Sequence, residues 1–145
     1  MAQALVRCVQ QRLQLEDSCL VIAVILLERL MLLVWEREGP IMTIKTWRSV
    51  LLTAILLACK LLYDEKVFLH DFQSALPELD LRHLGDTETT FLLSINFSAN
   101  VSSSTFARYW GALMDAGQQR EQQPRAESDS AGNLAGSPGT KVGRV

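Results

Sequence analysis

The side chains that could carry out catalysis are few, and their spacing fits no catalytic pattern. Cys59 and His70 would suggest a thiol nucleophile with a general base. Cys59, however, lies inside an apolar run, which is typical of a buried structural cysteine. The pair His70-Asp71 has no nucleophile at a matching distance along the chain. The sequence therefore predicts a protein that is not an enzyme.

Metal and cofactor sites are not predicted either. The sequence holds 3 cysteines but no CxxC pair, and neither His70 nor His83 stands at metal-ligand spacing from a cysteine. The acidic residues between positions 64 and 80 lack the spacing of a calcium loop, and no glycine-rich nucleotide motif occurs. An odd number of widely spaced cysteines fits reduced thiols, so we expect an intracellular protein, cytoplasmic or nuclear. A net charge of -2 argues against a nucleic-acid partner.

The remaining information lies in the helices that the apolar pattern predicts. Apolar residues recur at helical spacing, and no strand-like alternation is found. We expect helices at residues 2–13, 19–35, 43–63, 69–76 and 86–95 and from 102 onward. The helix at 69–76 is short, so the predicted architecture is an all-α fold of five main helices joined by short loops.

The composition changes near Gly117. The segment 118–145 contains no aromatic residue and few large apolar side chains, whereas every aromatic residue lies in 1–117. Such a segment cannot bury enough apolar surface to offset the loss of chain entropy on folding. The sequence therefore predicts one folded domain over 1–117, followed by a disordered tail over 118–145.

Two strongly apolar runs raise the alternative of a membrane-associated helical hairpin. The run 20–34 contains Glu28 and Arg29, each of which costs about 2.5–3.5 kcal/mol at the centre of a bilayer. The run 50–62 is shorter than the ~20 residues that a spanning helix needs. We therefore predict a buried helical core and no stable membrane span.

Several stretches of the chain, in order, resemble the cyclin box, and in particular that of the cyclin Y and PHO-type (P/U-type) branch. Residues 19–31, CLVIAVILLERLM, resemble the second helix of the box, and residues 47–60, WRSVLLTAILLACK, resemble the third. Residues 88–97 resemble the fourth helix and its end, and residues 101–110, VSSSTFARYW, resemble the opening of the fifth. The resemblance implies a single cyclin fold.

The same resemblance implies a function and a binding site. It implies a regulatory subunit that binds a cyclin-dependent protein kinase of the PCTAIRE, PFTAIRE or Pho type and activates it allosterically. Lys60 and Glu88 match the lysine and glutamate through which cyclins hydrogen-bond the kinase. Leu92 and Phe97 match apolar positions that pack on the αC helix of the kinase. A cyclin-fold scaffold that does not activate a kinase stays open as an alternative.

A structural ion pair is expected at Glu28, because an acidic residue in an apolar run needs a partner. The resemblance implies pairing with an arginine of the first helix. Arg7 is the better match and Arg12 is the alternative. The other interpretation is that Glu28 and Arg29 mark the solvated edge of their helix.

Overall fold

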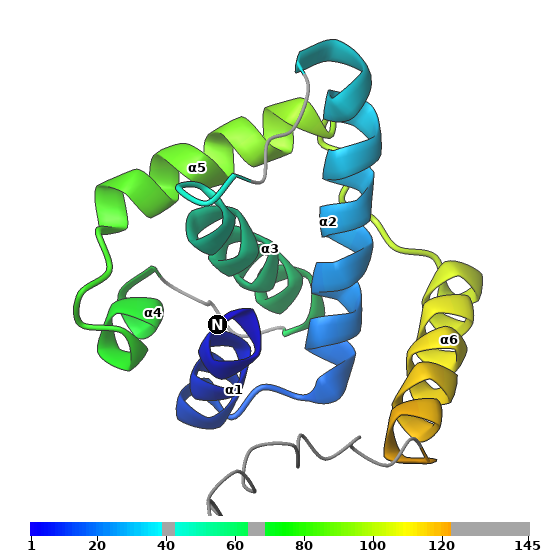
Figure 1. The fold of residues 1–145 in the computed structure, drawn as a ribbon. Coiled ribbons are helices and arrows are strands. Elements are labelled where there is room, and N and C mark those ends of the chain that lie inside the picture. The colour runs from blue at the N-terminus through cyan, green and yellow to red at the C-terminus, as the bar shows by residue number, and fades with distance from the viewer. Residues whose placement is uncertain (39–42, 64–68, 123–145) are drawn as a thin grey trace, which may run out of the picture.

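The computed structural model describes residues 1–38, 43–63 and 69–122, and these form six α-helices without a strand (Figure 1). The helices are α1 (Ala2–Leu13), α2 (Asp17–Glu38), α3 (Trp47–Leu62), α4 (Leu69–Ala75), α5 (Leu81–Ser94) and α6 (Ser103–Gln122). The predicted all-α class is confirmed. The five main helices are α1, α2, α3, α5 and α6, and α4 is the short helix that the sequence also indicated.

Helix α3 is the centre of the fold. It is buried at Val50 and at every residue from Leu52 to Cys59, in keeping with an apolar pattern that runs all the way round the helix. Its main packing partners are α2 and α5. In Figure 1, α2 runs along one side of α3, α5 crosses its start, and α6 lies beyond α2. The other helices are therefore positioned, directly or through a neighbour, by α3.

Helices α1 and α4 close the opposite side of the core. They pack against each other, and α4 also contacts α5 (Figure 1). Val9 of α1 and Phe72 of α4 are both fully buried. The guanidinium of Arg12 donates a hydrogen bond to the backbone carbonyl of Ala75, which ties the end of α1 to the end of α4. Helix α1 stops because Gln14 takes a left-handed conformation, with φ 51°.

The start of α5 lies at Leu81, earlier than the predicted residue 86. Asp80 is its N-cap, and the carboxylate of Asp80 accepts hydrogen bonds from the backbone N–H groups of Arg82 and His83 at 3.0 and 3.2 Å. An aspartate at this position satisfies N–H groups that would otherwise have no partner. The cap therefore allows α5 to begin at Leu81. The polar residues and Gly85 in this stretch weaken the apolar helical pattern, so the sequence alone did not predict this first part of the helix.

The predicted domain boundary at Gly117 does not coincide with a helix end. Helix α6 continues through Gly117 to Gln122, so residues 118–122, which we expected in the tail, are helical. Glutamine, arginine and glutamate are good helix formers and propagate a helix that has already started. The rest of the predicted tail, 123–145, lies outside the described residues.

The apolar run of α2 is used for packing on α3. Cys19, Ile22, Leu26 and Leu30 are buried along one face of the helix. Within the described ranges, no helix combines the length and the apolar character that crossing a membrane requires.

Ala54 and Ala58 provide the first test of the packing. Both are fully buried, and their small side chains let neighbouring helices approach α3 closely. We expect Ala54→Leu and Ala58→Leu each to lower the free energy of unfolding by ~1–3 kcal/mol, because extra volume in a packed core forces strain. Thermal and denaturant melts measure this. Ala116→Leu, at an exposed position of α6, is the matched control and should change little. Equal melting of all three variants would contradict a central α3.

Thr53 provides a second test. Its side chain is fully buried, and its Oγ1 has no hydrogen-bond partner among the described residues. A buried polar group without a partner destabilises a fold by ~1–3 kcal/mol. Valine has the shape of threonine without the hydroxyl, so Thr53→Val should raise the free energy of unfolding by about 1 kcal/mol. Thr53→Ser, which keeps the hydroxyl and loses the methyl, should lower it. A valine variant less stable than wild type would show that the hydroxyl is paired.

Candidate functional site

The structure brings together two residues, Lys60 and Glu88, for which the cyclin resemblance implies separate contacts with a kinase. Lys60 lies in the last turn of α3, and Glu88 lies in the middle of α5. The Nζ atom of Lys60 is 2.5 Å from Oε1 of Glu88, and the two side chains are 37% and 15% exposed. The ion pair therefore joins α3 to α5 at the surface, with Glu88 the better shielded of the two.

Exposed apolar side chains are also found at the end of α3, on α5 and directly after α5. Leu61 follows Lys60 directly and is exposed, and Leu93 is exposed near the end of α5. Leu92, one turn after Glu88, is half-buried and packs against the core. Phe97 is 66% exposed, an unusual position for a large aromatic side chain. The end of α3, helix α5 and the turn after it thus carry a cation, a carboxylate and exposed apolar side chains, which are residue types found in protein interfaces.

The backbone after α5 holds Phe97 in a conformation that bulky residues rarely adopt. Asn96 and Phe97 both lie in the left-handed region, with φ 51° and 55°. The N–H of Phe97 donates to the carbonyl of Leu92 at 2.8 Å, which fixes this turn to the end of α5. Strain of this kind persists only where the surrounding structure enforces it, and it is often found at functional positions.

Arg29 of α2 secures the connection between α5 and α6. Its Nη1 donates hydrogen bonds to the backbone carbonyls of Ser98 and Asn100, both at 2.7 Å. The segment directly after Phe97 is thereby fixed to α2. This role of Arg29 was not predicted from the sequence, which gave Arg29 only as part of a solvated edge in the alternative interpretation of Glu28. No local sequence pattern predicts that an arginine will hydrogen-bond backbone carbonyls about seventy positions away.

The predicted buried ion pair between Arg7 and Glu28 is not formed. Both side chains are exposed, and the ion pairs found within the described residues are Lys60–Glu88 and Arg48–Glu78. The physical reason lies in the geometry of α2. Glu28 is two residues from both Leu26 and Leu30, which places it about 200° around the helix from that buried face. Glu28 therefore points to solvent and needs no partner.

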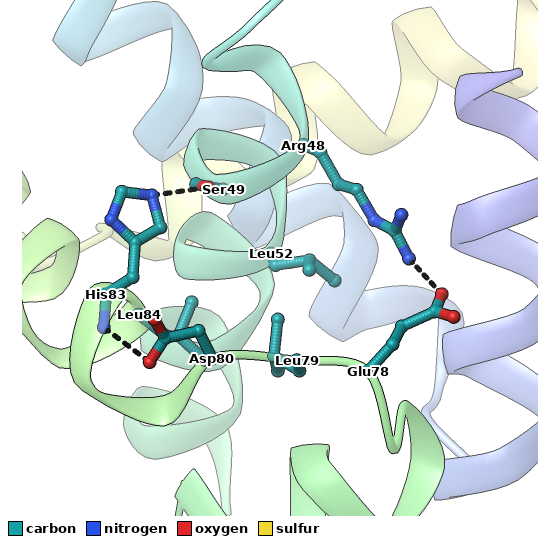
Figure 2. A pocket seen from close by; sticks show the side chains of 8 residues that line it. All are labelled: Arg48, Ser49, Leu52, Glu78, Leu79, Asp80, His83 and Leu84. Carbon is teal, nitrogen blue, oxygen red and sulfur yellow. Dashed lines mark hydrogen bonds and ion pairs between the residues drawn. The ribbon is translucent and has the colours of Figure 1, made fainter.

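A small pocket of about 160 Å³ lies between the start of α3 and the start of α5 (Figure 2). Its apolar floor includes Leu52 and Leu84. On its rim, Arg48 Nη2 is 2.7 Å from Glu78 Oε1, and His83 Nε2 is 3.0 Å from Ser49 Oγ (Figure 2). The polar groups on the rim are thus paired with each other, and these pairs connect α3 to the start of α5 and to the segment before it.

Comparison with protein families identifies the domain. The family model described as the N-terminal domain of cyclins matches residues 1–100. This match covers more than half of the chain, and the chain belongs to the cyclin family. Cyclin-family domains are in general regulatory domains that bind protein kinases and are not catalysts themselves. No solved structure was found to match the chain.

A double-mutant cycle tests the ion pair itself. We expect Lys60→Ala, Glu88→Ala and the double variant to give a coupling energy of about 0.5–1.5 kcal/mol in denaturant unfolding, because Glu88 is largely shielded from water. The matched control is Arg48–Glu78, whose side chains are 46% and 73% exposed. That pair should give less than ~0.5 kcal/mol, because water screens exposed charges. A coupling near zero for Lys60 and Glu88 would show that the pair is not maintained in solution.

Proposed function

We propose that this chain binds a cyclin-dependent protein kinase through the surface around Lys60, Glu88, Leu92 and Phe97, and that it activates the kinase allosterically. The observation that carries the proposal is the direct contact of Lys60 with Glu88 on two different helices. These are the positions that the cyclin resemblance selects for kinase contact. Membership of the cyclin family supports a kinase as the partner.

The ion pair is well suited to hydrogen-bond a partner backbone. The ammonium of Lys60 has three N–H donors, of which one faces Glu88, and the second carboxylate oxygen of Glu88 is available as an acceptor. Lys60 can thus donate to a carbonyl of the kinase while Glu88 accepts from an N–H. Since the two charges compensate each other, docking does not transfer an unpaired charge out of water. The kinase needs no charged side chain of its own at this point.

The apolar side chains would supply most of the apolar surface that is buried when the kinase binds, since the ion pair itself offers little. Phe97 is already turned outward by the backbone after α5, and Arg29 fixes the following segment. An anchor that is ordered before binding loses little conformational entropy on association. Aromatic anchors of this kind contribute much of the affinity in protein interfaces. We assign Phe97 and Leu92 to contacts with the αC helix of the kinase.

The proposed mechanism requires no catalytic group of this chain. By packing on αC, the chain holds that helix inward, so that the lysine–glutamate pair of the kinase active site can form. The same contact helps to order the activation loop. The resemblance to the cyclin Y and PHO-type branch favours a PCTAIRE, PFTAIRE or Pho-type kinase in the cytoplasm or nucleus.

Alanine variants at the proposed surface test this function. Lys60→Ala, Glu88→Ala and Phe97→Ala should each weaken the complex with a purified kinase of this group, measured by calorimetry, and reduce its activation. Truncating one partner of a buried charged hydrogen bond costs ~2–5 kcal/mol, and less at the edge of an interface. The melting temperature should change little for Phe97→Ala, because this side chain is exposed.

Arg48→Ala is the matched control, since Arg48 also belongs to an ion pair between α3 and a later segment but lies outside the proposed surface. It should bind the kinase like wild type. If all three surface variants bind like wild type, the proposed surface is wrong. If the folded wild-type chain binds none of these kinases, the scaffold hypothesis replaces kinase activation.

A further inference from the structure

Two buried thiols face each other at the junction of α2 and α3. Cys19 lies in the first turn of α2, and Cys59 lies in the last turn of α3. Their Sγ atoms are 3.3 Å apart, and one thiol donates a hydrogen bond to the other. The residues are 0% and 1% exposed, respectively. The third cysteine, Cys8, is partly buried on α1. Neither thiol is exposed, so neither is part of the surface assigned to kinase binding, although Cys59 directly precedes Lys60.

We propose that Cys19 and Cys59 form a redox site at which a hydroperoxide converts the two thiols into an intrachain disulfide between α2 and α3. A disulfide has an S–S distance of about 2.05 Å, so the two sulfur atoms need to approach by only about 1.3 Å. Both cysteines lie in terminal turns of their helices, where the backbone adjusts more easily than in a helix interior.

The reaction runs in two steps. The thiolate of Cys59 attacks one oxygen of the hydroperoxide, the O–O bond breaks, and Cys59 becomes a sulfenic acid. The hydroxide or alkoxide that leaves takes up the proton that the Cys59 thiol had released. The sulfur of Cys19 then attacks Sγ of Cys59, the S–O bond breaks, and water leaves with the proton of Cys19. The two thiols lose two electrons in total, and the hydroperoxide gains them.

The contact between the thiols decides which of them reacts first. The hydrogen bond from Cys19 lowers the pKa of Cys59, because the donated S–H stabilises the thiolate of Cys59. The same hydrogen bond, together with burial, raises the pKa of Cys19. Cys59 is therefore the attacking thiolate, and Cys19 is the thiol that resolves the sulfenic acid.

Burial makes the site selective for small oxidants. Hydrogen peroxide is scarcely larger than a water molecule and can enter when the terminal turn of α2 or α3 opens briefly. A disulfide of peptide size, such as glutathione disulfide, cannot reach either sulfur while the fold is intact. The junction is also held by the backbone N–H of Glu16, which donates to the hydroxyl of Tyr63 at 3.1 Å. We therefore expect the larger oxidant to react far more slowly than hydrogen peroxide.

The disulfide would change the stability of the fold. It would link two residues 40 positions apart in the sequence and so restrict the unfolded chain. It would also fasten the start of α2 to the end of α3, the two helices that form the largest contact in the core. Oxidation is therefore expected to raise the midpoint of thermal unfolding by roughly 5–15 °C.

The experiment uses the full chain carrying Cys8→Ser, so that only the two proposed cysteines remain. After treatment with hydrogen peroxide, intact mass under non-reducing conditions should fall by two hydrogen atoms, and dithiothreitol should restore it. The fraction of the chain that unfolds at the higher temperature should equal the fraction that has lost two hydrogen atoms. Glutathione disulfide under the same native conditions should leave the mass unchanged. The chain with Cys8→Ser and Cys59→Ser is the matched control and should form no intrachain disulfide.

Other results would overturn the proposal. These are two thiols that stay free for alkylation after denaturation, oxygen addition without loss of hydrogen, a disulfide between two chains, or equally fast oxidation by glutathione disulfide. Should Cys8→Ser fail to fold, non-reducing peptide mapping of the peroxide-treated wild-type chain decides the matter. A peptide linked through Cys19 and Cys59 supports the site, and any linkage to Cys8 contradicts it.

Discussion

The burial of α3 on all its sides is the constraint from which the other features follow. A helix without a solvated face along most of its length must be surrounded, and here α2 and α5 do most of the surrounding. Lys60 extends from the end of this helix, Glu88 lies on α5 packed across it, and Arg29 lies on α2 packed beside it. The helices that carry the candidate surface are thus all packed on the core.

This arrangement explains how a surface with so few charges can be specific. The ion pair fixes the spacing of one donor and one acceptor, and the turn after α5 fixes the backbone that carries the exposed Phe97. The helices that carry these features pack on the core, and Arg29 fixes the backbone directly after Phe97. Recognition of a protein through such a surface depends on geometry more than on net charge, which agrees with the slight charge of the whole chain.

Much of the fold could be predicted from the sequence, because the governing pattern is local. The all-round apolar run after Trp47 predicts a central helix, and family-like spacing selects Lys60 and Glu88. The contact between those two residues could not be predicted, because residue spacing along the sequence does not tell how far apart two different helices lie. The same limit explains why a partner was predicted for Glu28, whereas the structure shows Glu28 exposed and Arg29 bound to the segment after α5. They are neighbours in sequence but about 100° apart on α2, and only the position of the chain after α5 decides which one is used.

The backbone at Phe97 also bears on how this domain can diverge. Glycine adopts a left-handed conformation without strain, so a chain under selection for stability alone gains by replacing this phenylalanine. Such a replacement removes the exposed ring and leaves the turn intact. The phenylalanine therefore couples backbone strain to the presence of an exposed ring, and a chain cannot relieve the one through glycine without losing the other.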